Sequence, residues 1–220
     1  MFSKFRPNPI FKDRRDAGRK LAECVREYVP ARDVLVLALP RGGVPVGYEV
    51  AEALAAELDV FIVRKIGLPG QEELAIGAIA SGGIRVLNED LIREVDLSET
   101  VLEQLTARER IELHRREQFY CGGRAAAHLT DRTIVLVDDG LATGASMRAA
   151  CLAVREQHPA VIIVAVPVAA RETGRELERC ADRVVCVATP SPFFAVGSWY
   201  EDFSQTTDEE VQQLLAQHSA

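Results

Sequence analysis

The sequence lacks the features that mark three large classes of protein. Its five cysteines are scattered and form no C-x-x-C pair, so neither a disulfide framework nor a zinc knuckle is predicted. Its apolar runs are far shorter than the roughly 20 residues that a membrane-spanning helix needs, and the first ten residues contain no signal-peptide core. Basic residues are not in excess, because 26 lysines and arginines stand against 33 aspartates and glutamates. We therefore expect a cytoplasmic protein with neither a membrane nor a nucleic acid as its partner.

The 220 residues are 48% hydrophobic and contain no internal repeat or low-complexity tract, which is typical of one globular domain. Charge is unevenly spread, since lysines and arginines outnumber acids in the first 30 residues, and residues 189–220 contain acids but no lysine or arginine. The two ends could attract each other within one chain or across a homodimer, or could be solvated independently. These alternatives stay open.

Short apolar runs without alternating polar residues recur at residues 34–39, 60–66, 134–137, 161–166 and 184–187. Such unbroken runs are typical of strands covered on both faces, as in a parallel sheet. Helical patterns lie between them at residues 13–28, 46–57, 146–157 and 172–180. The alternation predicts an α/β fold with an open, mostly parallel sheet flanked by helices.

The interval from about residue 67 to 131 is too long for a simple connection between two strands. It begins with a glycine-punctuated stretch and continues into a charged helix over residues 98–119 that has only a thin apolar stripe. We interpret it as a helical and loop insertion in a single domain of residues 1–220. The aromatic segment from about residue 189 to 220 is expected to form a C-terminal hood that ends in a helix from about Asp208.

The strongest chemical signal is an apolar strand at residues 133–137 that is followed by Asp138 and Asp139 and then by a loop of small residues leading into a helix. Ligands of open α/β sheets bind at the carboxyl ends of the strands. The low side-chain bulk lets backbone N–H groups converge on a phosphate at the helix N-terminus, and the carboxylates suit hydroxyls or a metal ion beside it. The combination of loop and carboxylates favours a sugar phosphate. The absence of a P-loop and of a G-x-G-x-x-G motif disfavours nucleotide hydrolysis and dinucleotide binding. The alternative is an ordinary side-chain N-cap after a tight turn.

Residues 135–146 closely resemble the phosphoribosyl-pyrophosphate (PRPP) signature of the type I phosphoribosyltransferases. The resemblance implies that fold, and a Mg²⁺-dependent transfer of phosphoribosyl to a nitrogen acceptor, such as a nucleobase, with release of pyrophosphate. Asp138 and Asp139 would then hold the ribose hydroxyls and, largely through PRPP, the metal ion. The residues implied to hold the 5-phosphate are Ala142, Thr143, Gly144, Ala145 and Ser146.

Two further segments carry the resemblance. Pro40-Arg41-Gly42-Gly43 resembles the pyrophosphate loop of this family, which implies a cis peptide bond between Pro40 and Arg41 and pyrophosphate contacts from Arg41, Gly42 and Gly43; alone, it is also a common turn. Arg64 and Lys65 stand at the end of another predicted strand, and residues 63–70 faintly resemble elements of adenine phosphoribosyltransferases. We expect them to contact pyrophosphate and to make a positive cleft in an acidic chain, although a solvated lysine at a strand end is the alternative.

The acceptor is not identified by a motif. Phe194 and Trp199 are candidates for stacking on a planar base, and hydrophobic packing of the terminal segment is the alternative. The second functional hypothesis is a non-catalytic regulatory protein that senses PRPP or a nucleotide on the same fold. The intact carboxylate pair and Arg-Gly-Gly favour the enzyme. An aspartate-based phosphatase is disfavoured, because the first predicted strand does not end in an acid and no lysine follows residue 65.

Overall fold

The computed structural model describes residues 8–30, 32–122 and 126–218, apart from the side chains of residues 72 and 73, and a five-stranded sheet forms its centre. The strand order is β2 (Glu57–Val60), β1 (Val34–Ala38), β6 (Thr133–Val137), β7 (Val161–Val168) and β8 (Arg183–Ala188), and every neighbouring pair is parallel. β1 and β6 are buried at every position, because both faces of the sheet are covered. The predicted open parallel α/β fold is confirmed.

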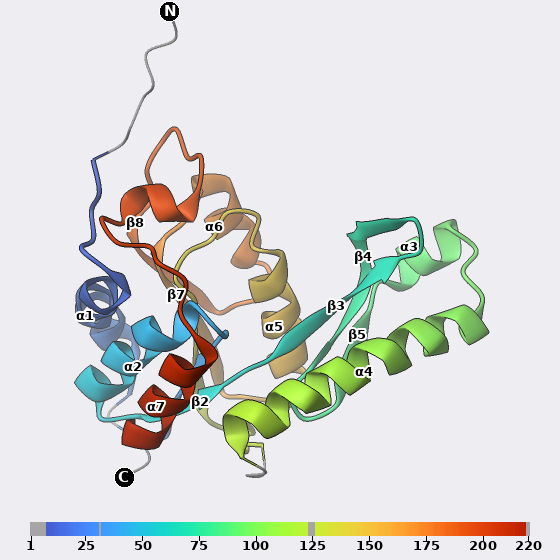
Figure 1. Ribbon diagram of the computed structural model, residues 1–220, viewed down its shortest axis with the longest axis horizontal. Coiled ribbons are helices and arrows are strands. Elements are labelled where there is room, and N and C mark those ends of the chain that lie inside the picture. The colour runs from blue at the N-terminus through green and yellow to red at the C-terminus, as the bar shows by residue number, and fades with distance from the viewer. Residues whose placement is uncertain (1–7, 31, 123–125, 219–220) are drawn as a thin grey trace, which may run out of the picture.

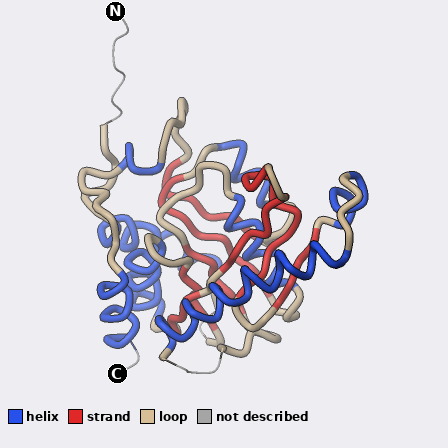
Figure 2. Tube along the Cα trace, turned by 45° about the vertical axis from the view of Figure 1, so that its right-hand side comes forward, coloured by secondary structure: helices blue, strands red, loops and turns tan. Residues whose placement is uncertain are grey.

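Helices enclose this sheet from both sides (Figure 1 and Figure 2). α1 (Arg14–Val25), α2 (Gly43–Leu54) and α7 (Asp208–His218) pack on one face, and α5 (Ala145–Arg155) and α6 (Arg171–Leu177) pack on the other. Within β1, Val36 packs toward the first layer and Leu37 toward the second. The helix predicted over residues 46–57 exists but lies about three residues earlier in the chain. α2 starts at Gly43 and stops where Ala55 adopts a left-handed conformation with φ 49°.

A second, antiparallel sheet contains β3 (Val63–Leu68), β4 (Gln71–Ala80) and β5 (Ile84–Leu87) in that order. The prediction of one strand over residues 60–66 is therefore wrong. Phe61 N donates to Ala38 O in the central sheet, whereas Ile62 N donates to Ser81 Oγ and Ser81 N donates to Ile62 O. The backbone thus passes from one sheet to the other inside a continuous apolar run, which conceals the change. The insertion predicted to be helical and loop therefore also contains two strands, β4 and β5.

Two helices follow the small sheet. α3 (Glu89–Glu94) is short, and α4 (Glu99–Cys121) packs across β3 and β4 (Figure 1). As predicted, α4 is a long helix with a narrow buried stripe, and Ile111 on its outer side is 73% exposed. None of the helices in the described ranges combines the length and the apolar character needed to cross a membrane.

The segment before α1 and the segment before α7 contact each other within one molecule. A parallel bridge joins Phe11 to Tyr200, and Arg14 Nη1 donates to Ser204 O at 2.6 Å. The short 3₁₀ helices Arg26–Tyr28 and Val196–Trp199 complete the described elements. The C-terminal segment therefore lies against α1 and the edge of the central sheet where β6 ends.

Candidate active site

The loops that follow β1 and β6 meet at the carboxyl edge of the central sheet, because the two strands are neighbours. The bond within Pro40-Arg41 is cis, as the resemblance implied. A Cβ atom at Gly42 would lie 2.0 Å from Asp139 Oδ2, and one at Gly43 would lie 2.7 Å from Val137 O at the end of β6. Glycine at both positions is therefore required for this close approach.

The loop of small residues after β6 leads into a helix whose N-terminus has no side-chain cap. The N-cap of α5 is Gly144, with φ +68°, and a Cβ there would lie 2.6 Å from Thr173 Cγ2. Thr173 Oγ1 donates to Ala142 O at 2.6 Å and so fixes the loop from α6. The first N–H groups of a helix lack partners within the helix, so the start of α5 offers donors and a positive dipole end to an anion. The alternative of an ordinary side-chain N-cap is wrong.

The residues predicted to hold a 5-phosphate differ in their exposure. Ala142, Thr143 and Ser146 are exposed, Ala145 is half-buried and Gly144 is buried. The loop can therefore be reached from outside although its centre is packed against α6.

Asp138 and Asp139 are adjacent but have different surroundings. Asp138 Oδ1 accepts a hydrogen bond from Asp139 N at 2.8 Å, and burial, then the charge of Asp139, raises the pKa of Asp138 well above its ordinary value. Burial also raises the pKa of Asp139, but Arg14 opposes this rise, because Arg14 Nε donates to Asp139 Oδ2 at 2.8 Å. The side chains of Arg14 and Asp139 are 11% and 15% exposed. Negative charge is therefore stabilised on Asp139 in preference to Asp138.

Sequence reasoning missed two residues that contact Asp139. Arg14 lies 125 positions earlier in the chain, and Tyr200 Oη donates to Asp139 O at 2.6 Å. Burial raises the pKa of Tyr200 and keeps it a hydrogen-bond donor. The basic N-terminus and the aromatic C-terminal stretch were the available signals, but neither identifies the partner.

The predicted pyrophosphate-binding cations lie in three different surroundings. Arg41 Nη1 is 3.8 Å from Asp208 Oδ1 at the start of α7. Arg64 Nε and Nη2 lie 2.9 and 2.8 Å from Glu109 Oε2 on α4. Lys65 is exposed on β3, within the small sheet rather than at the carboxyl end of a central strand as predicted.

A family model described as the phosphoribosyl transferase domain matches residues 10–202. The chain belongs to this family. Two curated Mycobacterium tuberculosis proteins, from strains CDC 1551 / Oshkosh and H37Rv, are each 46% identical to it over 206 residues, or 94% of this chain. Both are named as putative phosphoribosyl transferases. The chain spans 46% of the length of each of them.

The phosphoribosyl transferase domain also resembles a crystal structure of a protein from Thermus thermophilus. The identity is 44% and the TM-score is 0.85, with 94% of this chain and 98% of that chain covered. The two chains therefore share their fold over nearly all of the residues compared.

The two aromatic residues predicted to contact an acceptor differ in burial. Trp199 is 7% exposed and packs in a cluster with Phe11, Val168 and Tyr200, which favours the packing alternative for this residue. Phe194 is 63% exposed on the same C-terminal segment of the phosphoribosyl transferase domain. Phe194 therefore has a ring surface that a ligand can reach.

A cavity of about 690 Å³ adjoins the small-residue loop of this phosphoribosyl transferase domain. Thr143 and Ala145 form one side, and the small sheet, including Lys65, forms the other. Arg148 on α5 also lines it. Lys65 is therefore placed beside the loop predicted to bind the 5-phosphate.

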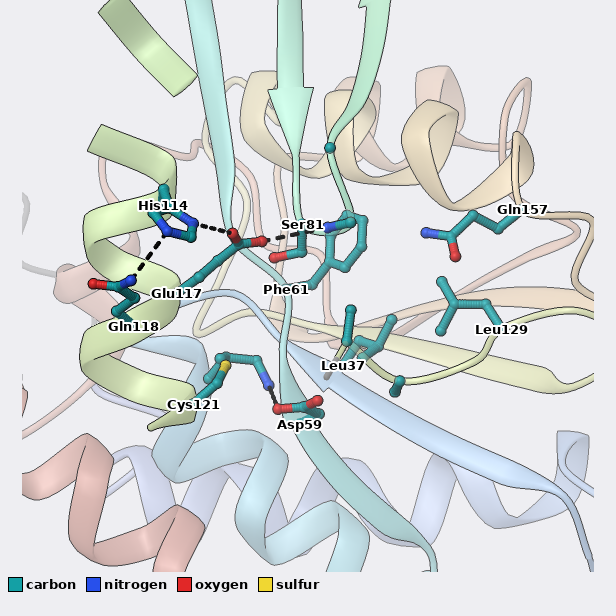
Figure 3. Close-up of a pocket in the computed structure, with 15 residues that line it drawn as sticks. Leu37, Asp59, Phe61, Ser81, His114, Glu117, Gln118, Cys121, Leu129 and Gln157 are labelled. Carbon is teal, nitrogen blue, oxygen red and sulfur yellow. Dashed lines mark hydrogen bonds and ion pairs between the residues drawn. The ribbon is translucent and has the colours of Figure 1, made fainter. Parts of the chain in front are cut away.

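A separate cavity of about 440 Å³ lies between α4, the β4–β5 turn and the edge of the central sheet. Figure 3 shows its apolar wall, which includes Leu37, Phe61 and Leu129, and its polar wall, which includes His114 and Glu117. None of the predicted site residues lines this cavity.

The carboxylates fit a magnesium ion that takes most of its ligands from a substrate. Within the described ranges, no group of three or more histidine, cysteine, aspartate or glutamate side chains could hold a metal ion alone. Asp138 and Asp139 offer oxygen donors, and one Asp139 oxygen already accepts from Arg14. Magnesium is commonly held by one or two carboxylates together with substrate phosphates and water.

Proposed function

We propose that this domain transfers the 5-phosphoribosyl group of PRPP to a nitrogen acceptor, such as a nucleobase, and releases pyrophosphate. The observation that carries the proposal is the uncapped N-terminus of α5 on the same short loop as two half-buried carboxylates. A phosphate bound by the residues 142–146 leaves the attached ribose close to Asp138 and Asp139. Membership of the phosphoribosyl transferase domain family supports this assignment.

Each part of the site has a role in the proposed displacement. The bond from C1 of ribose to pyrophosphate oxygen breaks, a bond from C1 to the acceptor nitrogen forms, and the acceptor loses a proton. The carboxylates stabilise positive charge that develops on the ribose, and Asp139 is the better placed because Arg14 favours its ionised form. A magnesium ion, held by PRPP with Asp138 and Asp139, would neutralise charge on the departing pyrophosphate.

The loop of residues 40–43 receives the pyrophosphate in this proposal. Gly42 and Gly43 bring its backbone against the carboxylates, and Arg41 exchanges its contact with Asp208 for phosphate oxygens. Lys65 supplies positive charge from the small sheet. Phe194 stacks on the acceptor.

The test is to incubate the protein with PRPP, Mg²⁺ and a panel of purines, pyrimidines and small nitrogenous acids, and to measure pyrophosphate. We expect release with at least one acceptor. Replacing Asp138 and Asp139 with asparagine should reduce the rate by about 100-fold or more without unfolding the protein. Asp131→Asn, in an exposed position with φ 60° that asparagine tolerates, is the matched control.

A regulatory protein that binds PRPP without turnover is the second candidate. The observation that favours it is that Asp139 and Arg41 already have ionic partners, Arg14 and Asp208, within the chain. Binding of PRPP without pyrophosphate release for any acceptor would support this candidate. Absence of PRPP binding would contradict both.

A further inference from the structure

Arg14 is held from three directions at the edge of the candidate site. Its Nε donates to Asp139 Oδ2 at 2.8 Å, and its Nη1 donates to Ser204 O at 2.6 Å. Its guanidinium carbon lies 4.0 Å from the centre of the Phe203 ring. These contacts fix both the position and the plane of the guanidinium group.

The same contacts determine how Asp139 is turned. Arg14 Nε and the backbone at Gly42 both lie against Oδ2, since a Cβ at Gly42 would be 2.0 Å from that atom. The other carboxylate oxygen, Oδ1, is left as the one that can receive a hydroxyl group. Asp138 differs, because its Oδ1 accepts from the next residue of its own loop. The orientation of Asp139 therefore depends on a helix distant in sequence, whereas that of Asp138 is stabilised locally.

We propose that Arg14 is a positioning residue for phosphoribosyl transfer, which holds the Asp139 carboxylate in the orientation that receives a ribose hydroxyl. This inference rests on the proposed function. Through Ser204 and Phe203, Arg14 also makes that orientation dependent on the C-terminal segment. The N-terminal helix and the C-terminal segment are then parts of the ribose site rather than outer supports.

A purely structural ion pair that attaches α1 to the sheet is the competing explanation. It predicts that loss of Arg14 lowers stability and leaves the kinetics of the folded fraction unchanged. A positioning role predicts a change in PRPP kinetics in protein that remains folded, because a small displacement of a group that contacts substrate costs up to about 100-fold in rate.

The experiment compares Arg14→Met and Arg14→Lys with the wild type, and uses Arg15→Met as the matched control. Arg15 is the next residue of the same helix, but it pairs with Glu49 at 3.2 Å and is about half exposed. The readouts are the KM for PRPP, the KM for the acceptor, kcat and the thermal unfolding midpoint. Direct PRPP binding is measured alongside by calorimetry.

We expect Arg14→Met to reduce kcat/KM for PRPP by about 100-fold while the KM for the acceptor changes less than threefold. Arg14→Lys should recover part of this loss, because it restores the charge without the planar fork. Arg15→Met should remain within twofold of the wild type. If Arg14→Met unfolds, the folded Arg14→Lys variant decides, with at least a tenfold loss expected.

PRPP kinetics within twofold of the wild type in the folded Arg14 variant would overturn the inference and leave the proposed function intact. An equal loss in Arg15→Met would overturn it as well, because the effect would then belong to α1 as a whole. A wild-type protein that neither binds nor consumes PRPP would instead overturn the proposed function, and the inference with it. The two failures are distinguished by whether they occur in the variant or in the wild type.

Discussion

At the scale of single residues, Gly42 shows how little space separates the two loops of the candidate site. We expect Gly42→Ala to lower the free energy of unfolding by about 1–3 kcal/mol, because the new methyl group would collide with Asp139 Oδ2. Pyrophosphate release should fall by about 100-fold as the loops separate. Urea denaturation and the release assay provide the measurements.

Gly174→Ala is the control for this prediction. Gly174 lies within α6, and a Cβ there would meet no atom within 4 Å. This variant should be unchanged or more stable by up to about 1 kcal/mol, because alanine is the better helix former. A Gly42→Ala protein as active and as stable as Gly174→Ala would contradict the close approach of the loops.

Cys180 gives a second prediction at this scale. A hydrogen bond with Cys151, helped by the charges of Arg148 and Arg155, lowers the pKa of Cys180 to about 7, although partial burial opposes the shift. The thiolate is the reactive form, so alkylation by iodoacetamide should rise through pH 7 and level off above about pH 8. Cys151→Ala should move this profile to higher pH.

Mass spectrometry of the modified peptides measures the rate at each cysteine in one sample. Cys186 is the internal control, because burial raises its pKa to about 11. Its alkylation should still be increasing at pH 10. A Cys180 profile that continues to climb steeply at pH 9 would contradict the lowered pKa.

At the scale of secondary-structure elements, the change of sheet between Phe61 and Ile62 depends on Ser81. The Ser81 hydroxyl is buried and accepts from Ile62 N at 3.0 Å. We expect Ser81→Ala to lower the free energy of unfolding by about 1–3 kcal/mol, because it leaves a buried backbone donor without this partner. Urea denaturation measures the loss, and an unchanged midpoint would show that the hydroxyl is dispensable at this junction.

The same junction shows where sequence patterns stop being informative. The apolar runs at residues 34–39 and 134–137 predicted β1 and β6, because central strands of a parallel sheet are buried on both faces. The run at residues 60–66 also begins with four apolar residues, yet it divides between two sheets, because hydrophobicity records burial and not the hydrogen-bond partner. β4 and β5 were missed because the glycines within and between them, Gly77, Gly82 and Gly83, were taken as loop signals.

The candidate site shows a similar division. Asp138, Asp139 and the small residues after them are contiguous, so one motif was enough to predict the small-residue loop and the carboxylates as neighbours. Arg14 could not be predicted, because its contact with Asp139 is created by the packing of α1 and not by local spacing. The predicted role of Lys65 in binding pyrophosphate stays a prediction.

At the scale of the whole molecule, the last turn of α7 is attached to the C-terminal end of α2. His218 Nδ1 lies 2.9 Å from Glu52 Oε1, and its Nε2 lies 2.8 Å from Ala56 O. We expect His218→Ala to lower the free energy of unfolding by about 1–2 kcal/mol, because both contacts are lost at a nearly buried position. Thermal unfolding of His128→Ala, at an exposed loop position, is the control. Equal midpoints for the two variants would contradict this attachment.

Besides packing on β3 and β4, α4 is part of the connection between two parallel strands of the central sheet. β2 and β6 run in the same direction on either side of β1, so the intervening chain must travel back along the full height of the sheet. The 23 residues of α4 extend about 35 Å, roughly twice the length of a five-residue strand. The long helix is thus the return path of a parallel crossover as well as a cover for β3 and β4. Natural shortening of this domain should therefore trim the β4–β5 hairpin first and keep a return segment, since the chain must still come back before it can start β6.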